Sequence, residues 1–242
     1  MAEQEIIKHT KKIFGIWKTE SSFLHKLSDF ILEIFIIVFA ITLSIYFHDQ
    51  SELRHQRKET KEFLLGLRED LKTDTVEMND DKDSYSNAGH IFQYITNRKL
   101  KEVLNSDTIN KYFHWIMNTT GLIPNDGRFE GFKSSGKIGT IENEELQNNI
   151  MDLYQEDIPS VITGTNAYTQ RKEKLFDYLT ANLKRITDTT TNFVSVLSTE
   201  QAFNICIGLN YVGQIMERYD SCISKARAII KEIDKEYGNE NK

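Results

Sequence analysis

Residues 131–138, GFKSSGKI, match the phosphate-binding loop pattern G-x-x-x-x-G-K-[ST] at every position but the last. That chemistry needs backbone N–H groups and a lysine for the phosphates, and a hydroxyl group for magnesium. Here the hydroxyl position holds Ile138, no hydrophobic strand precedes Gly131, and no later apolar run ends in a magnesium-binding aspartate. We therefore predict that this segment binds no nucleotide and that Lys137 has no catalytic role.

The same stretch is typical of a turn between helices. A glycine with positive φ commonly closes a helix, and Gly136 stands where such a residue is needed. We predict a one-turn helix before the turn and apolar anchors on both sides of it, packed onto a helical bundle. The predicted turn and anchor residues are Phe129, Phe132, Gly136 and Ile138, with Ile141 buried beyond them.

Two further sets of residues could carry chemistry by type. His48, Glu52 and His55 fall at i, i+4 and i+7, on one face of a helix. The two histidines would lie about 10 Å apart along the axis, too far to share one metal ion, so we interpret this face as solvated. No Ser/His/Asp or Cys/His set stands at a recognisable motif. We predict no cofactor, no metal site and no enzyme activity.

The two cysteines are expected to be small buried thiols. Cys206 and Cys222 lie on one predicted helix, about 24 Å apart. A disulfide between them is excluded at that distance unless the helix breaks at Gly208 or Gly213.

Composition points to helices and away from nucleic acid. The chain has 242 residues, only two prolines and a net charge of −6. Few prolines favour uninterrupted helices. A negative chain with no cluster of Lys and Arg among aromatic residues offers nucleic acid no general attraction.

The strongest single signal is the apolar run from Phe30 to Phe47, FILEIFIIVFAITLSIYF, which contains one charge, Glu33. It is long enough to cross a hydrocarbon core of about 30 Å. We predict an uncleaved transmembrane helix, because about thirty residues precede it and no small-residue cleavage site follows it. A buried core helix is the alternative.

The sides of the membrane and the role of Glu33 stay open from the residues alone. The positive charges before the apolar run (Lys11, Lys12, Lys18, Lys26) balance those after it (Arg54, Arg57, Lys58, Lys61). An ionisable residue in a membrane helix is a functional candidate, for a proton or a helix partner, but Glu33 is also near enough to the interface to reach water. Before the run, apolar residues among lysines would form either an amphipathic surface helix or a loose tail.

The fold prediction is all-α, with one N-terminal transmembrane helix that continues into a stalk and an antiparallel helical bundle. The predicted divisions are an N-terminal segment 1–28, a transmembrane helix 29–48, a stalk 49–83 and a bundle 84–242. Leu64, Leu67, Leu71 and Met78 form a helix-packing seam on the predicted stalk.

Within the bundle, capping and breaker residues predict the helices. We expect helices over 84–97, from an N-cap at Ser106 to Met117, over 142–157 with a break near Pro159, over 160–187, and from a capping box at 198–201 to Tyr237. A loop is expected over 119–128.

Three blocks of sequence are similar to a family of short single-pass membrane proteins of unknown function widespread in Bacteroidota. The blocks are LEIFIIVFAITLSIYFHDQSE (32–52), KEFLLGLREDLKTD (61–74) and FEGFKSSGKIGTIENEELQNNIMDLY (129–154). The chain departs from the family pattern in having His48 and Asp49 where asparagines are common, and in lacking the tryptophan after the apolar run. The resemblance implies an inner-membrane anchor with residues 1–28 in the cytoplasm and the bulk of the chain in the periplasm. It implies no biochemical activity.

Two classes of function follow. The first is a non-catalytic, membrane-anchored interaction or assembly protein with an unknown membrane or periplasmic partner. The second is a sensor or ion-coupled accessory subunit that uses Glu33. Ala40 and Ser44 form a small-x-x-x-small pair that favours close helix association in the bilayer, so we also expect a homo-oligomer, most simply a parallel dimer, whose contact the leucine seam could extend. The alternative is that Ala40 and Ser44 face lipid and that the leucines pack onto the chain's own bundle.

Overall fold

The computed structural model describes residues 23–99 and 102–238, with side chains from Leu27 onward. Its contacts divide the chain into two compact units, Met1–Lys58 and Glu59–Lys242, which we describe one at a time. Helix α2 (Phe23–Thr96) begins in the first unit and ends in the second. Residues 1–22, most of the predicted N-terminal segment, lie outside the described residues.

In the first unit, α2 exposes apolar side chains on every side. The large hydrophobic residues from Phe30 to Phe47 are each between 40% and 65% exposed. Water is a poor solvent for such a surface, whereas hydrocarbon is a good one. Among the described residues, α2 is the one helix long and apolar enough to cross a membrane, as the sequence predicts.

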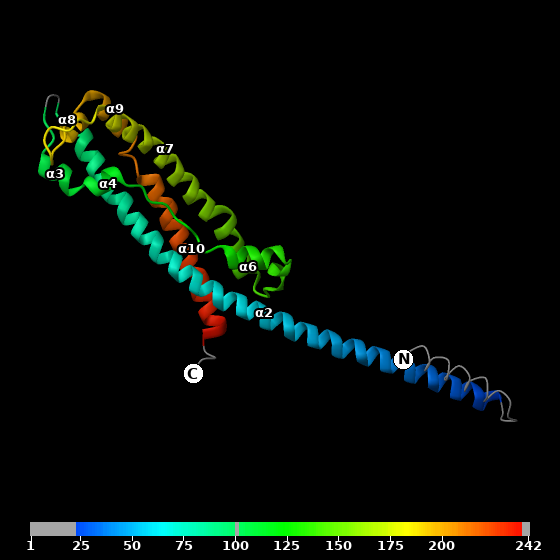
Figure 1. Ribbon diagram of the computed structural model, residues 1–242. Coiled ribbons are helices and arrows are strands. Elements are labelled where there is room, and N and C mark those ends of the chain that lie inside the picture. The colour runs from blue at the N-terminus through cyan, green and yellow to red at the C-terminus, as the bar shows by residue number, and fades with distance from the viewer. Residues whose placement is uncertain (1–22, 100–101, 239–242) are drawn as a thin grey trace. The chain divides into compact units, whose positions relative to one another are not determined.

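The second unit confirms the all-α prediction, since its described residues form helices, turns and one isolated β-bridge. After α2 come α3 (Ser106–Lys111), α4 (Phe113–Met117), α5 (Gly127–Ser134), η1 (Lys137–Thr140), α6 (Glu144–Asp152), η2 (Leu153–Asp157), α7 (Ile158–Asn182), α8 (Phe193–Leu197), α9 (Glu200–Ile207) and α10 (Gly213–Tyr237). Figure 1 shows that α2, α7 and α10 are its long helices.

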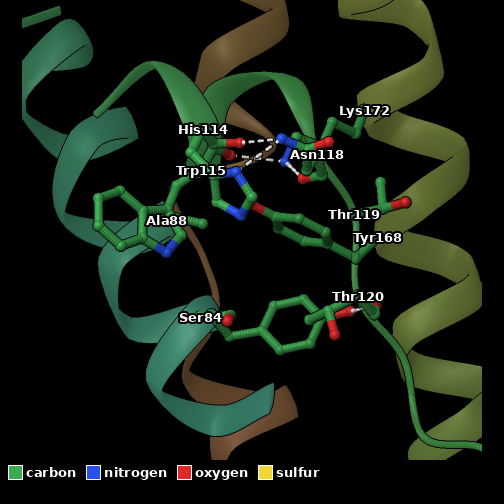
Figure 2. Close-up of a pocket in the computed structure, with 10 residues that line it drawn as sticks. Ser84, Ala88, His114, Trp115, Asn118, Thr119, Thr120, Tyr168 and Lys172 are labelled. Carbon is green, nitrogen blue, oxygen red and sulfur yellow. Dashed lines mark hydrogen bonds between the residues drawn. The ribbon is translucent and has the colours of Figure 1, made fainter. Parts of the chain in front are cut away.

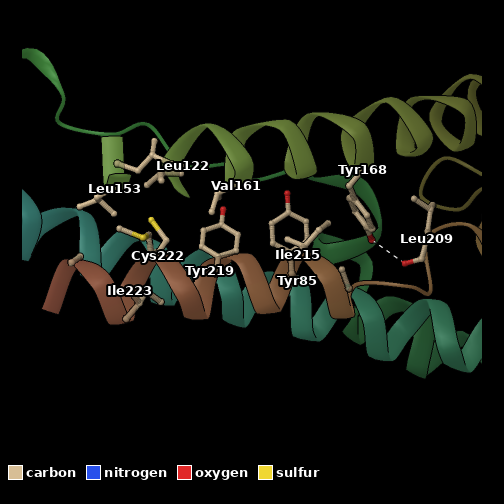
Figure 3. Close-up of a cluster of buried hydrophobic side chains, with 14 of the residues drawn as sticks. Tyr85, Leu122, Leu153, Val161, Tyr168, Leu209, Ile215, Tyr219, Cys222 and Ile223 are labelled. Carbon is tan, nitrogen blue, oxygen red and sulfur yellow. Dashed lines mark hydrogen bonds between the residues drawn. The ribbon is translucent and has the colours of Figure 1, made fainter. Parts of the chain in front are cut away.

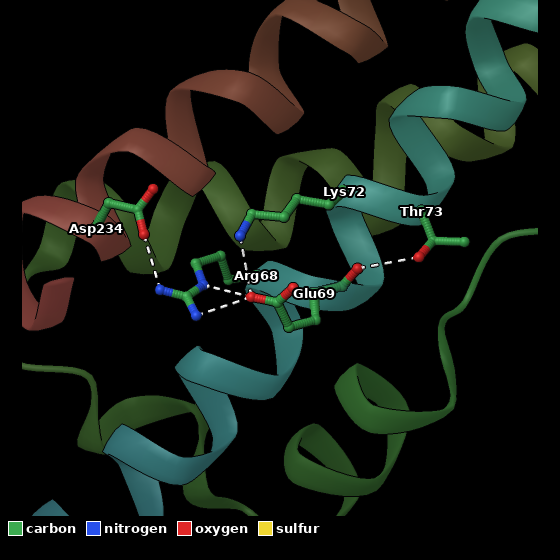
Figure 4. Close-up of polar contacts among 5 residues, drawn as sticks. All are labelled: Arg68, Glu69, Lys72, Thr73 and Asp234. Carbon is green, nitrogen blue, oxygen red and sulfur yellow. Dashed lines mark hydrogen bonds and ion pairs between the residues drawn. The ribbon is translucent and has the colours of Figure 1, made fainter. Parts of the chain in front are cut away.

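Helix α10 runs antiparallel to α2. Arg68, early in the part of α2 that belongs to the second unit, donates to Asp234 near the end of α10 at 2.8 Å (Figure 4). The Tyr219 hydroxyl near the start of α10 donates to Asp81, further along α2, at 2.7 Å. Arg68 also pairs with Glu69, which accepts from Lys72 on the next turn of α2. These ion pairs are exposed and contribute little stability, so they report register more than they hold the fold.

Helix α7 runs parallel to α2. Their contacts advance together, from the Tyr85 and Tyr168 rings, 5.2 Å apart, to the Lys172 ammonium 5.9 Å from the Phe92 ring. Parallel neighbours need a connection that returns the chain to its starting end. Residues 118–126 provide it as an extended segment that runs back along the bundle (Figure 1).

The leucine seam lies inside the second unit. Leu64, Leu67, Leu71 and Met78 have no exposed surface and belong to one continuous hydrophobic core. Residues 59–83, which the sequence suggested as a stalk outside the bundle, are therefore part of the compact unit that begins at Glu59. Further along, the core includes three tyrosines, Tyr85, Tyr168 and Tyr219 (Figure 3).

Two predicted helix starts move by one residue. The N-cap of α3 is Asn105, not Ser106, because the Asn105 side chain accepts the Thr108 N–H. The N-cap of α9 is Thr199, whose hydroxyl accepts the Ala202 N–H, and not Ser198 of the predicted capping box. In both pairs two adjacent residues are good N-caps, and the local backbone decides between them.

The predicted break near Pro159 is wrong. The π-helical turn η2 joins α6 to α7 without a loop, and Pro159 lies in the first turn of α7. A proline lacks the N–H for a helical bond and its ring crowds the preceding turn, so a wider π turn accommodates it without ending the helix. At its other end α7 stops at Asn182, before the predicted Thr187.

The single long C-terminal helix is also wrong. Helix α9 ends at Ile207 and α10 starts at Gly213. Between them Leu209 is fully buried and its carbonyl accepts the Tyr168 hydroxyl at 3.3 Å. On α2, Gly89 permits the close approach of Val212, since a Cβ there would lie 2.7 Å from a Val212 methyl carbon. Tertiary packing of the connecting residues, rather than propensity, breaks the helix.

Candidate functional site

The segment that imitates a phosphate loop is packed onto the bundle by its aromatic residues. Phe129 is fully buried and its ring stacks on Tyr154 at 4.4 Å, while the Phe132 ring stacks on Phe63 at 3.9 Å. Both rings belong to α5, which at Gly127–Ser134 is longer than the predicted single turn and takes in the end of the predicted loop. Ile138 is half-buried against the core, and Ile141 is buried.

The turn itself has the geometry of a helix terminus. Gly136 has φ 74° in the left-handed region and directly precedes η1. The Lys137 ammonium donates to both carboxylate oxygens of Glu59 at 2.9 Å. This lysine is thus an ion-pair partner that ties the turn to the beginning of α2 in the second unit.

The residues predicted for the membrane helix all lie on the first unit. Ala40 and Ser44 are exposed and one turn apart on the same face of α2, and Glu33 is half-buried. The Thr42 hydroxyl, between them in sequence, donates to the Val38 carbonyl at 2.8 Å, which satisfies it without water. Such a bond lets a hydroxyl sit in hydrocarbon at low cost.

The histidines and cysteines singled out in the sequence lie in different surroundings. His48 and His55 are exposed on α2. Across residues 23–99 and 102–238, no group of three or more His, Cys, Asp or Glu side chains could hold a metal ion. Cys206 and Cys222 are free and buried on the separate helices α9 and α10, and burial raises the pKa of each thiol to about 12. At neutral pH both are inert thiols.

A row of carboxylates on α2 holds the extended return segment. Four acidic residues recur at spacings of four, three and four, which places them on one face of the helix. Their donors are the Arg128 guanidinium to Asp70 at 2.7 Å, the Asn125 N–H to Asp74 at 3.2 Å, the Ile123 N–H to Glu77 at 2.9 Å, and the Thr120 hydroxyl to Asp81. We call these four residues the carboxylate row. The return segment forms no helix or strand, so these carboxylates accept hydrogen bonds that its donors would otherwise lack.

Two members of the carboxylate row are inside the core. Asp81 accepts both the Thr120 and Tyr219 hydroxyls and is 5% exposed. Asp74 is fully buried, and burial raises its pKa although Asn125 donates to it. Each buried carboxylate is retained by donors that replace water, which is the condition for keeping such a group in a core.

The least expected residue of the second unit is Lys172 on α7, which is 1% exposed. Its ammonium donates to the Trp115 carbonyl at 2.7 Å and to the Asn118 carbonyl, both at the end of α4 (Figure 2). The rings of Phe92 and Phe176 each lie 5.9 Å from it. Desolvation on burial lowers the pKa of Lys172 to about 8. Its contacts fix the end of α4 and the beginning of the return segment.

Sequence reasoning missed both Lys172 and the carboxylate row, although each carries a signal. Lys172 falls in the buried register of α7, between Tyr168 and Leu175 at spacings of four and three. A lysine in an otherwise apolar heptad position indicates a buried amine. The carboxylate row follows the same period as the leucines of α2, which indicates a second face with partners of its own.

We found no family model, no curated protein and no solved structure that matches this chain. Function is therefore argued from the residues described above.

Proposed function

We propose that this chain is a non-catalytic, membrane-anchored interaction or assembly protein. Residues 30–47 cross the bilayer once, residues 1–28 face the cytoplasm, and the second unit stands in the periplasm. The proposal is supported chiefly by one observation: the apolar side chains of the first part of α2 are exposed on every side, whereas those of the second unit are in a closed core. The partners are the lipid bilayer, a second copy of the chain and a further membrane or periplasmic protein.

The proposed sidedness is supported by the resemblance of the anchor and stalk blocks to single-pass proteins of Bacteroidota, because the flanking charges balance. The test uses single cysteines at Thr10 and at Gln170, an exposed residue of α7, in the native background, where Cys206 and Cys222 are buried. In cells with a permeable outer membrane, an impermeant thiol reagent should label Gln170→Cys and spare Thr10→Cys. The reverse pattern contradicts the proposed orientation.

The proposed assembly role is tested by the size of the native complex. After cross-linking in intact cells and gentle solubilisation, the 28.2 kDa chain should run in a complex of at least two protein chains. A chain that is recovered only as a monomer, with and without cross-linking, contradicts a role in assembly.

The second candidate function is a sensor or ion-coupled subunit, and it is favoured by one residue, Glu33, a half-buried acid within the apolar part of α2. The two functions differ in their response to Glu33→Gln, which removes the ionisable proton and keeps the size. An assembly protein should form the same complex with this variant. Loss of the associated cellular function with an intact complex would instead favour ion coupling.

A further inference from the structure

A small cavity lies beside Lys172 in the second unit. Its volume is about 40 Å³, and α2, α4, the return segment and α7 contribute its walls. Figure 2 shows Lys172 at one end, near His114 and Asn118, and Ser84 and Thr120 at the other. About 10 to 15 Å³ suffices for one water molecule. The cavity can therefore hold a group larger than a single water.

The cation beside this cavity lacks a counter-ion. Lys172 makes no ion pair with any described residue, and no carboxylate is among the residues that line the cavity. The carboxylate bonded to its wall is Asp81, through the Thr120 hydroxyl, and Asp81 also accepts from Tyr219. The other titratable groups at the wall are His114, Tyr85 and Tyr168, none of which supplies a negative charge at neutral pH. A buried charge without an opposite charge is costly.

The ammonium also has bonding capacity to spare. It carries three N–H donors, and two of them have acceptors, the Trp115 and Asn118 carbonyls. The third N–H has no acceptor among the described residues, so it is available to a group in the cavity. The Thr120 carbonyl, which is an acceptor at this wall, already accepts a hydrogen bond from the Tyr85 hydroxyl at 2.7 Å. The cavity thus offers a donor and a positive charge.

We propose that this cavity is a binding site for a small monovalent anion of the size of chloride, with the Lys172 ammonium as its charged ligand. The anion neutralises the buried charge and accepts the third N–H. Because Lys172 joins α7 to the end of α4, binding stabilises the connection that returns the chain along α2.

The lowered pKa of Lys172 is consistent with a site that is incomplete without its anion. Burial alone brings the pKa to about 8, and an adjacent negative charge favours the protonated amine. Occupation of the site should therefore keep Lys172 charged at neutral pH.

The test compares chloride with gluconate, a much bulkier anion, on the full-length protein in a non-ionic detergent at constant ionic strength. The variants are Lys172→Gln, which keeps N–H donors and removes the charge, and Lys174→Gln, an exposed lysine on the same helix as the matched control. For a dissociation constant of about 10 mM, about 0.2 M chloride should raise the Tm of the wild type by about 3 to 7 °C. Lys174→Gln should show the same shift and Lys172→Gln none.

Line broadening of the ³⁵Cl resonance provides a second measurement that needs no unfolding. The wild type should broaden the free chloride signal, bromide should compete, and Lys172→Gln should lose most of the effect. If Lys172→Gln fails to fold, the test rests on the wild type. The proposal then requires that the wild type broadens the chloride resonance and that bromide, but not gluconate, reverses this broadening. Absence of a chloride effect in the wild type, or an equal effect in folded Lys172→Gln, overturns the proposal and leaves Lys172 as a helix clamp beside a water-filled cavity.

Discussion

Helix α2 has two parts with opposite relations to their surroundings. Between Phe30 and Phe47 every large apolar side chain is exposed, whereas Leu64, Leu67 and Leu71 are fully buried. Both parts are α-helix, and both are rich in leucine, isoleucine or phenylalanine. The difference lies in the arrangement: apolar residues on all faces in the first part, and on one face in the second.

The comparison teaches that periodicity, more than hydrophobicity, separates a lipid-facing helix from a core helix. In the second part a polar face is also in use, since the carboxylate row binds the return segment through Asp74, Glu77 and Asp81, and the first turn of α5 through Asp70. One face of this part therefore packs against hydrophobic side chains and another binds an extended chain. In the first part the expected solvent is hydrocarbon, so no face needs a protein partner.

The largest expected difference between the two parts of α2 is the change in Tm when an apolar side chain is shortened to alanine. Leu67→Ala removes a side chain with no exposed surface and should cost about 2 to 5 kcal/mol, which lowers the Tm of the second unit by about 5 to 15 °C. Ile37→Ala, the matched change in the first part, should leave that Tm within about 2 °C. The measurement is thermal unfolding followed by near-ultraviolet circular dichroism in detergent. Equal losses would mean that the first part also packs against protein.

A smaller effect is expected on the polar face of the second part. Asp81→Asn leaves one oxygen to accept from two hydroxyls, so either Thr120 or Tyr219 must turn to accept a hydrogen bond instead. We expect a cost of about 1 to 3 kcal/mol and a fall in Tm of about 3 to 10 °C. Asp80→Asn changes the adjacent, exposed residue and serves as the control. If Asp81→Asn and Asp80→Asn have the same Tm, the carboxylate row does not hold the return segment.

The sequence predicts much of this comparison and misses part of it for a physical reason. The apolar run and the leucine spacing identify both parts of α2, because length and period are properties of the chain alone. They do not say what the leucine face touches. A seam of Leu64, Leu67 and Leu71 fits a second copy as well as the chain's own bundle, and only the packing of α5 and α10 against this part of α2 decides for the bundle.

The remaining errors arise where long-range contacts override local preference. The break between α9 and α10 falls between Gly208 and Gly213, where the sequence allowed one, but it is realised through Leu209 and Val212, which pack against residues far away in sequence. The burial of Lys172 depends on two backbone carbonyls of another helix, and a pattern that classes lysine as polar places it on the surface. The placement of Phe129 and Phe132 could be predicted because it depends only on a local turn and on a core next to it.

The smallest expected effect concerns association of the first part of α2. The leucine seam cannot extend a contact between two copies, because its side chains are already in the core of their own chain. Association through α2 must then rest on Ala40 and Ser44 alone, where small side chains let two backbones approach and the Ser44 hydroxyl adds about 0.6 to 2 kcal/mol. In a transmembrane association assay on residues 26–52, Ala40→Ile and Ser44→Ile should each reduce the signal. Val38→Ile, an enlargement by one methylene on the opposite face, should not. Equal signals from all variants would remove this face from the interface, and any oligomer of the full chain would then depend on the surface of the second unit.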